Sequence, residues 1–245
     1  HEMILDNVVT LIFNKILEIP SDCSKPYADI CAAQVTNESA TNYTSKFRNA
    51  IINYVEEINR HTEEYHQRVA NNVVDNSKET DKEKKMWNHF ELMKWKDQFK
   101  RTKIFLSHLY LLDVIPSRIL HSTLSSLLCL IAKEGKEQDD DSIESELQLL
   151  QMCGGKMQDE VIRDAVECPD RPSSFDFFGI FDTLEQALPR VSERIKYKIN
   201  CILALRANGW VEIEASEKTQ SAKSSQVLPD DNHSSDDGDV DWLRE

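Results

Sequence analysis

Apolar residues recur along most of the chain with a spacing typical of core-facing helices. Between residues 3 and 17 they fall three or four positions apart, at Ile4, Leu5, Val8, Val9, Ile12, Phe13 and Ile16. This spacing places them on one broad face of an α-helix. Further helices are predicted over 26–35, from 43 onward, and over 86–112, 116–133, 142–153, 175–188 and 192–207. No alternation typical of a strand persists, so the chain is predicted to be all-α.

Helix-breaking residues separate these segments. The first helix is expected to end before Pro20, because the residue preceding a proline disfavours helix. Asp141 or Ser142 is the expected N-cap of a helix that Gly154 and Gly155 interrupt. Residues 71–85 are polar and are interpreted as a solvated loop or a frayed helix extension.

The predicted helices succeed one another through mostly short turns, and Asn208 with Gly209 ends the last of them. Helical pairs recur roughly every 40–45 residues, which is the size of a HEAT-type repeat. Clear self-similarity between the pairs is lacking. We therefore expect an all-α fold that is an α-solenoid of antiparallel HEAT-like helical hairpins.

Composition supports this class and excludes several others. Six Gly and seven Pro are too few for the turns of a β-sandwich or a barrel, and 40% apolar residues suffice for a core. The six cysteines form no C-x-x-C pair, so neither a disulfide framework nor a zinc site is predicted, and a reducing compartment fits. No apolar run reaches the ~18 residues of a membrane span. The chain opens directly in a helical pattern, as expected of a piece of a longer protein, and not with a signal peptide.

Charge restricts the partners that the chain can attract. The net charge is −14, and both residues 1–215 and residues 216–245 are acidic. General attraction to nucleic acid is therefore excluded, and RNA binding would have to rest on a local patch. One such patch lies in "KWKDQFKRTKIF", whose basic residues are Lys94, Lys96, Lys100, Arg101 and Lys103.

The aromatic residues within that stretch leave two interpretations open. Trp95 and Phe99 lie four apart among the bases, and aromatic rings next to bases can stack nucleobases while the bases hold phosphate. In the alternative, the rings belong to the core and the lysines are merely solvated on the opposite face. The five basic residues are the RNA-binding candidates.

Signatures of catalysis and metal binding are missing from the sequence. The "CGGK" stretch at 153–156 lacks the spacing of a phosphate-binding loop. His61 and His66 are five residues apart and do not share a helical face. The acidic run at 139–141 lacks the ligand spacing of a calcium loop and suits a solvated turn that caps a helix. We predict no enzyme, no catalytic residue, no metal and no cofactor.

The domain boundary is placed between a helical domain at 1–212 and an acidic tail at 213–245. The tail holds few apolar residues and is predicted to be disordered when free. Near its end Trp242 and Leu243 lie among aspartates, a common form for a short docking motif. Trp242 is therefore a candidate partner-binding residue; the alternative is a solubilising tail.

Several segments resemble the middle domain of eukaryotic translation initiation factor 4G, in the right order along residues 7–211. They are "NVVTLIFNKILEIPSDCSKPYADIC", "FRNAIINYVEEINR", "KIFLSHLYLLDVI", "LLQMCGGKM" and "RIKYKINCILALRANGWV". The Cys-Gly pair and the Leu-Arg-x-Asn-Gly-Trp ending are the more telling matches. Two departures stand out: Ser107 and His108 replace a frequent Gly-Glu, and "VEIEAS" follows Trp210 where basic residues are frequent.

The resemblance implies a non-enzymatic platform of HEAT-like hairpins. Its expected partners are a DEAD-box RNA helicase of the initiation-factor-4A type, other proteins of translation or of messenger ribonucleoproteins, and often RNA, with no membrane. The alternative is an RNA-processing or decay adaptor with the same fold and another partner. A cytoplasmic location is expected, with the nucleus as the alternative. The candidate partner-binding residues are Phe47, Arg48, Arg194, Lys198, Arg206 and Trp210, together with Trp242.

The last predicted helix carries two of these candidates on one side. Arg194 and Lys198 lie four apart, where like charges repel mildly, so an acidic partner is expected nearby. Trp210 is expected to pack back over the end of the solenoid and close its core.

Overall fold

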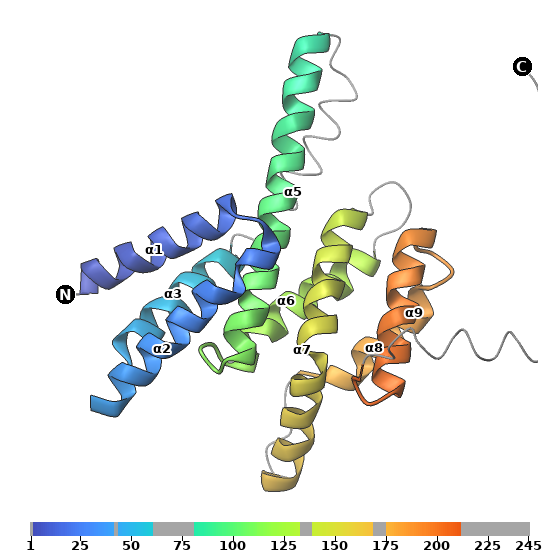
Figure 1. The fold of residues 1–245 in the computed structure, drawn as a ribbon. Helices are drawn as coiled ribbons and strands as arrows, with labels where there is room; N and C mark the ends of the chain where they lie inside the picture. Colours follow the sequence, from blue (N-terminus) through green and yellow to red (C-terminus); the bar gives the residue numbers. More distant parts are fainter. Residues whose placement is uncertain (1, 42–43, 61–80, 133–138, 169–174, 212–245) are drawn as a thin grey trace, which may run out of the picture. The chain divides into compact units, whose positions relative to one another are not determined.

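The computed structural model describes residues 2–41, 44–60, 81–132, 139–168 and 175–211, and all regular structure within them is helical. The helices, coloured along the chain in Figure 1, are α1 (Glu2–Glu18), α2 (Lys25–Thr41), α3 (Lys46–Arg60), α5 (Lys82–Leu111), α6 (Ser117–Ala132), α7 (Asp140–Glu167), α8 (Phe177–Ala187) and α9 (Glu193–Ala207). A short 3-10 helix at Ser21–Cys23 links α1 to α2. The prediction of an all-α fold is confirmed.

Helices close in sequence pack together in an overlapping series. Helix α3 contacts α1, α2 and α6, and α5 contacts α1, α2 and α7; α6 contacts α7 and α8, and α9 contacts α7 and α8. Each new helix thus buries its apolar face against the pair before it, which is the way stacked helical hairpins share one continuous core. Ring contacts mark this sharing: Phe13 of α1 lies 4.6 Å from Tyr54 of α3 and 5.2 Å from Phe105 of α5, between ring centroids.

Capping side chains account for several helix starts. Asp81 accepts hydrogen bonds from the backbone N–H groups of Glu83 and Lys84, and Asp176 accepts one from Gly179. Ser192 caps α9 through the N–H of Ile195, at 3.4 Å. Such caps satisfy the free donors of a first turn.

Some predicted boundaries are wrong. Helix α2 runs on to Thr41, and α5 begins at Lys82, inside the segment interpreted as loop or frayed helix. The N-cap of α7 is Asp139, not Asp141 or Ser142, because Ser142 turns its hydroxyl to the Asp139 carboxylate at 2.6 Å. Boundaries depend on such local bonds, which periodicity does not report.

The largest correction concerns the glycine pair. Gly154 and Gly155 do not interrupt a helix; both lie inside α7, which continues to Glu167. Glycine costs a helix interior about 1 kcal/mol relative to alanine, so a tertiary reason for the pair is expected. The reason is the ring of Trp210, which packs directly on these two residues.

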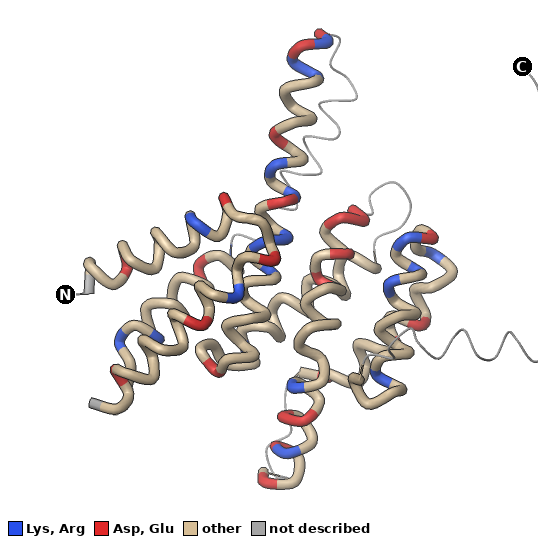
Figure 2. The backbone as a smooth tube through the Cα atoms, viewed as in Figure 1, with Lys and Arg blue, Asp and Glu red and all other residues tan. Residues whose placement is uncertain are grey.

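Basic and acidic residues both occur along α1, α5 and α9, whereas the first turn of α7 holds acidic residues only (Figure 2). In the part of the chain that the structure describes, no helix is both long and apolar enough to cross a membrane.

Candidate docking surface

The two bases predicted to face an acidic partner find one within the chain. Arg194 Nη2 lies 2.7 Å from Asp141 Oδ1, and Lys198 Nζ lies 3.4 Å from Glu144 Oε1. Arg194 also reaches Glu144 at 3.6 Å. Both carboxylates belong to α7, so these bases join α9 to α7, and their role toward another protein stays a prediction.

Lys96 of α5 extends this network. Its ammonium donates to Asp139 at 2.9 Å and to Asp141 at 2.8 Å. Burial by itself would lower the pKa of Lys96, but its bonds to the two aspartates raise it. Burial likewise opposes ionisation of Asp141, yet Lys96 and Arg194 lower the pKa of that carboxyl. The network therefore stabilises the fold at neutral pH, and this contribution is lost as pH falls through the lowered pKa of Asp141 or rises through the raised pKa of Lys96.

Trp210 closes the end of the core, as predicted. Asn208 caps α9, and the backbone of Gly209 and Trp210 has φ values of 66° and 65°, which turns the chain back toward α7. A Cβ added at Gly154 would lie 2.1 Å from the Trp210 ring, so only glycine leaves room for the ring there. The indole N–H donates to Gln158 Oε1 at 3.3 Å.

Arg206 belongs to the same closure. Its guanidinium carbon lies 3.9 Å from the ring centroid of Phe181, and the Phe181 ring lies 6.1 Å from that of Trp210. A guanidinium stacked on an aromatic face is held by cation–π attraction. Arg206 thus has a structural role that was not predicted for it, beside the predicted structural role of Trp210.

The predicted contacts at the start of α3 are less available. Phe47 is only 4% exposed and lies in the core, so its side chain offers almost no surface to a partner protein. Arg48 donates from Nε to the Val114 carbonyl at 3.0 Å, which ties α3 to the turn before α6. Trp242 lies outside the described residues.

The predicted RNA-binding stretch on α5 divides into core and surface. Lys103 is 2% exposed and pairs with the buried Glu146 of α7 at 2.9 Å, so it has no surface to offer RNA. Lys96 is held by the two aspartates of the network, and Arg101 donates to the Leu17 carbonyl at 3.0 Å. Lys94 and Lys100 are exposed.

The structure thus favours the view that much of this stretch serves packing. It does so for a physical reason: the helix turns 100° per residue, so consecutive bases cannot share one face.

Charge reversal of the two exposed lysines tests whether the RNA patch survives at the surface. We expect Lys94→Glu with Lys100→Glu to lower affinity for a labelled oligouridine by about tenfold, as lost phosphate contacts reduce counterion release. Fluorescence anisotropy over a salt series measures the loss. Lys15→Glu with Lys25→Glu, which changes the net charge equally on α1 and α2, is the control. An equal loss of affinity in both variants, or no RNA binding by the unaltered chain, would contradict an RNA-binding role of Lys94 and Lys100.

The sequence analysis missed an exposed apolar stripe on the first half of α5. Its members, called the α5 stripe, are Met86, Trp87, Phe90 and Met93, each at least 52% exposed. Met86, Phe90 and Met93 follow helical spacing, so by periodicity alone they are indistinguishable from a core-facing set. Large apolar side chains grouped on a surface mark a site of protein contact, and methionine adapts to varied partners.

The acidic and histidine side chains bear on whether the chain could hold a metal ion. Over the described ranges, no group of three or more His, Cys, Asp or Glu side chains is placed to hold a metal ion. Burial lowers the pKa of His108 and His121, which favours neutral imidazoles, and both rings are half-buried beside helices.

Comparison with known families gives one match along almost the whole described chain. The family model described as the MIF4G domain matches residues 2–209. No curated protein matches the chain. The resemblance to the middle domain of initiation factor 4G is thereby confirmed.

Proposed function

The chain belongs to the MIF4G domain family, and on this premise we propose that it docks a DEAD-box RNA helicase of the initiation-factor-4A type through the α5 stripe. The domain is an all-α HEAT-like solenoid of the kind that serves translation and messenger-RNA metabolism as a scaffold. The α5 stripe carries the proposal, because four large apolar side chains lie exposed on one helix.

The chain supplies binding and no chemistry of its own in this proposal. A scaffold raises a helicase's turnover by holding its two lobes in the closed, RNA-bound arrangement. This requires a higher affinity for that arrangement than for the open one. RNA would then meet the complex through the helicase and through Lys94 and Lys100, which lie beside and beyond the stripe on α5.

A reducing compartment accords with the cysteines, all six of which carry free thiols. Burial raises the pKa of Cys31 to about 11 and that of Cys153 to about 12, so both thiols stay protonated and unreactive. We therefore propose a cytoplasmic location, with the nucleus, which is also reducing, as the alternative.

The proposal predicts stimulation of a helicase. The chain alone should hydrolyse no ATP, and its addition should raise the RNA-dependent ATP turnover of an initiation-factor-4A-type helicase. Trp87→Ala with Phe90→Ala should lower affinity for the helicase by about tenfold or more, because central aromatic side chains dominate interfaces. Turnover assays and calorimetry measure the two effects.

Tyr197→Ala is the matched control, because Tyr197 is an equally exposed aromatic residue on α9. Circular dichroism should show all these variants folded, since the replaced rings are exposed. If the chain stimulates none of the source organism's helicases of this type, helicase docking is wrong. A stable complex with a protein of RNA processing or decay would then favour the adaptor. If stimulation survives loss of both rings, docking occurs elsewhere.

A further inference from the structure

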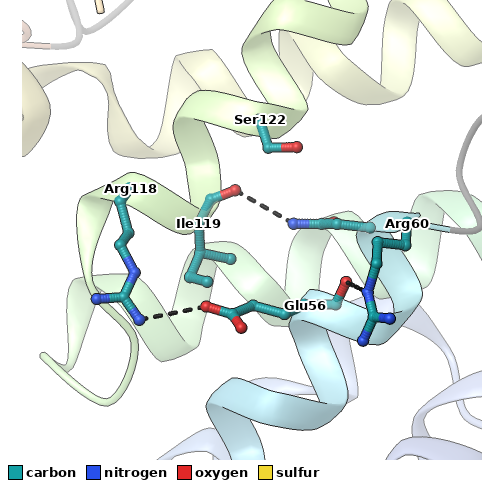
Figure 3. Close-up of a pocket in the computed structure, with 6 residues that line it drawn as sticks. Glu56, Arg60, Arg118, Ile119 and Ser122 are labelled. Carbon is teal, nitrogen blue, oxygen red and sulfur yellow. Dashed lines mark hydrogen bonds and ion pairs between the residues drawn. The ribbon is translucent and has the colours of Figure 1, made fainter. Parts of the chain in front are cut away.

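A hollow of about 390 Å³ lies between α3 and α6. Its lining residues are Glu56, Asn59, Arg60, Arg118, Ile119 and Ser122. Figure 3 shows the Glu56 side chain on α3 reaching Arg118 on α6, while the guanidinium of Arg60 on α3 points away from both Arg118 and Ser122. None of these residues belongs to the α5 stripe, so binding at this hollow does not depend on helicase docking.

From its charges and its unmet hydrogen-bonding capacity, we propose that this hollow binds a short acidic peptide segment of a partner protein. Two guanidinium groups, those of Arg60 and Arg118, stand against one carboxylate, that of Glu56. The local charge is therefore positive in a chain whose net charge is −14. The planar guanidinium of arginine binds a carboxylate through two parallel hydrogen bonds, which the ammonium group of lysine cannot form.

Arg118 can exchange its partner Glu56 for the carboxylate of a ligand, because their ion pair is weak. Its Nη2 lies 3.2 Å from Glu56 Oε1, with the two side chains 64% and 44% exposed. An exposed pair of this kind contributes at most about 1 kcal/mol. An incoming carboxylate can therefore replace Glu56 at Arg118 at little cost. Among the described residues Arg60 makes one weak hydrogen bond, from Nε to the Glu56 carbonyl at 3.4 Å, and its side chain is exposed.

Asn59 supplies the second observation. Its amide nitrogen donates to the Ile119 carbonyl at 3.3 Å, which fixes the side chain between the two helices. Its Oδ1 atom is buried and has no hydrogen-bond partner among the described residues. Leaving such an acceptor unpaired costs about 1–3 kcal/mol. A donor brought by a ligand regains that free energy, and a peptide backbone carries one N–H per residue.

The lining residues also favour a peptide over a nucleic acid as the ligand. Single-stranded nucleic acid is held by aromatic rings on which the bases stack, and none of the six lining residues is aromatic. The volume is within the range of sites that enclose a small ligand or a few side chains. An anion that also carries N–H donors satisfies both arginines and Asn59, and an acidic peptide is such a molecule.

The test uses the full chain and a fluorescein-labelled peptide of sequence Asp-Glu-Leu-Asp-Asp-Leu-Glu-Asp. We expect saturable binding by anisotropy that weakens with salt. We expect none for the peptide in which Asn and Gln replace every acid. Arg60→Glu with Arg118→Glu should lower affinity at least about tenfold, which corresponds to 1.4 kcal/mol. Ser122→Glu, which adds a carboxylate to the exposed rim, should weaken binding in the same direction.

Lys15→Glu with Lys25→Glu changes the net charge by the same amount at two exposed lysines outside the hollow, and should bind the peptide normally. Equal loss in this control would reduce the effect to overall charge and overturn the proposal. Retained binding in the arginine variant would also overturn it. If oligouridine binds more tightly than the peptide and with the same dependence on Arg60 and Arg118, the occupant is a nucleic acid and the proposal is wrong.

Discussion

Replacing Lys103 with Met is expected to lower the free energy of unfolding by about 3–5 kcal/mol, because it strands a buried carboxylate. Glu146 is fully buried, and Lys103 Nζ lies 2.9 Å from its Oε1. Beyond this ion pair, no described residue offers either oxygen of Glu146 a hydrogen bond. The ammonium also lies 4.7 Å from the centre of the Phe99 ring and donates to Thr123 Oγ1 at 3.4 Å.

The loss should depend on pH with a definite sign. Burial raises the pKa of Glu146, and Lys103 opposes that rise. In Lys103→Met the opposition is gone, so the pKa rises further. A carboxyl with a raised folded-state pKa stabilises the fold below its unfolded pKa and loses this contribution as pH rises through the folded value. The deficit of the variant should therefore be smallest in acid and largest at neutral pH.

Urea denaturation of the whole chain over a pH series measures both effects. The double variant Lys103→Met with Glu146→Leu should recover most of the lost stability, because an apolar pair of similar volume replaces a buried ion pair at little cost. Lys94→Met, on the exposed side of the same helix, is the control and should change stability by less than about 0.5 kcal/mol. A double variant as unstable as the single one would show that packing, not charge, is responsible.

Gly154→Ala is expected to destabilise the domain by about 2–3 kcal/mol, although alanine is the better helix former. The added methyl would lie 2.1 Å from the Trp210 ring, a distance that no methyl group tolerates. The ring cannot retreat freely, because its N–H is bonded to Gln158 and Phe181 packs against it. At Gly155 the nearest atom of Trp210 is 3.1 Å away, so Gly155→Ala should cost less.

The sign of the Gly154 effect should reverse when the ring is absent. In a Trp210→Ala background the methyl meets no indole, and Gly154→Ala should stabilise α7 by up to about 1 kcal/mol through helix propensity. Chemical denaturation of the four proteins of this cycle measures the coupling between the two positions. A Gly154→Ala change that costs the same with and without Trp210 would contradict the packing argument. The difference in fluorescence between each protein and its Trp210→Ala counterpart, which cancels the signal of the other three tryptophans, shows independently whether the ring has left its place.

Helix content and helix order were accessible from the sequence because they depend on neighbours in the chain. The spacing of Ile4, Val8 and Ile12 follows from the geometry of one helix, and the Asn208-Gly209 stop from local backbone preferences. The family motifs added the scaffold role. Boundaries failed where a local side-chain bond that periodicity does not report intervened, as at Asp139, the N-cap of α7, which accepts a hydrogen bond from the Ser142 hydroxyl.

The candidate site was less accessible, because a side chain's role depends on what lies opposite it. Arg194 and Lys198 did require acidic groups nearby, yet the sequence could not place them on α7. Lys103 and Lys94 belong to the same basic run, but one is buried against Glu146 and the other is exposed.

By itself, then, the sequence determined an all-α scaffold of helical repeats and the family to which it belongs, since these properties rest on periodicity and short motifs. Tertiary structure alone decided that two glycines inside α7 receive Trp210 and that part of the basic run is core. It also decided that Asn59, whose Oδ1 has no hydrogen-bond partner among the described residues, lines one hollow with two arginines. These properties need atoms from helices far apart in the chain, brought together by burial of the shared core.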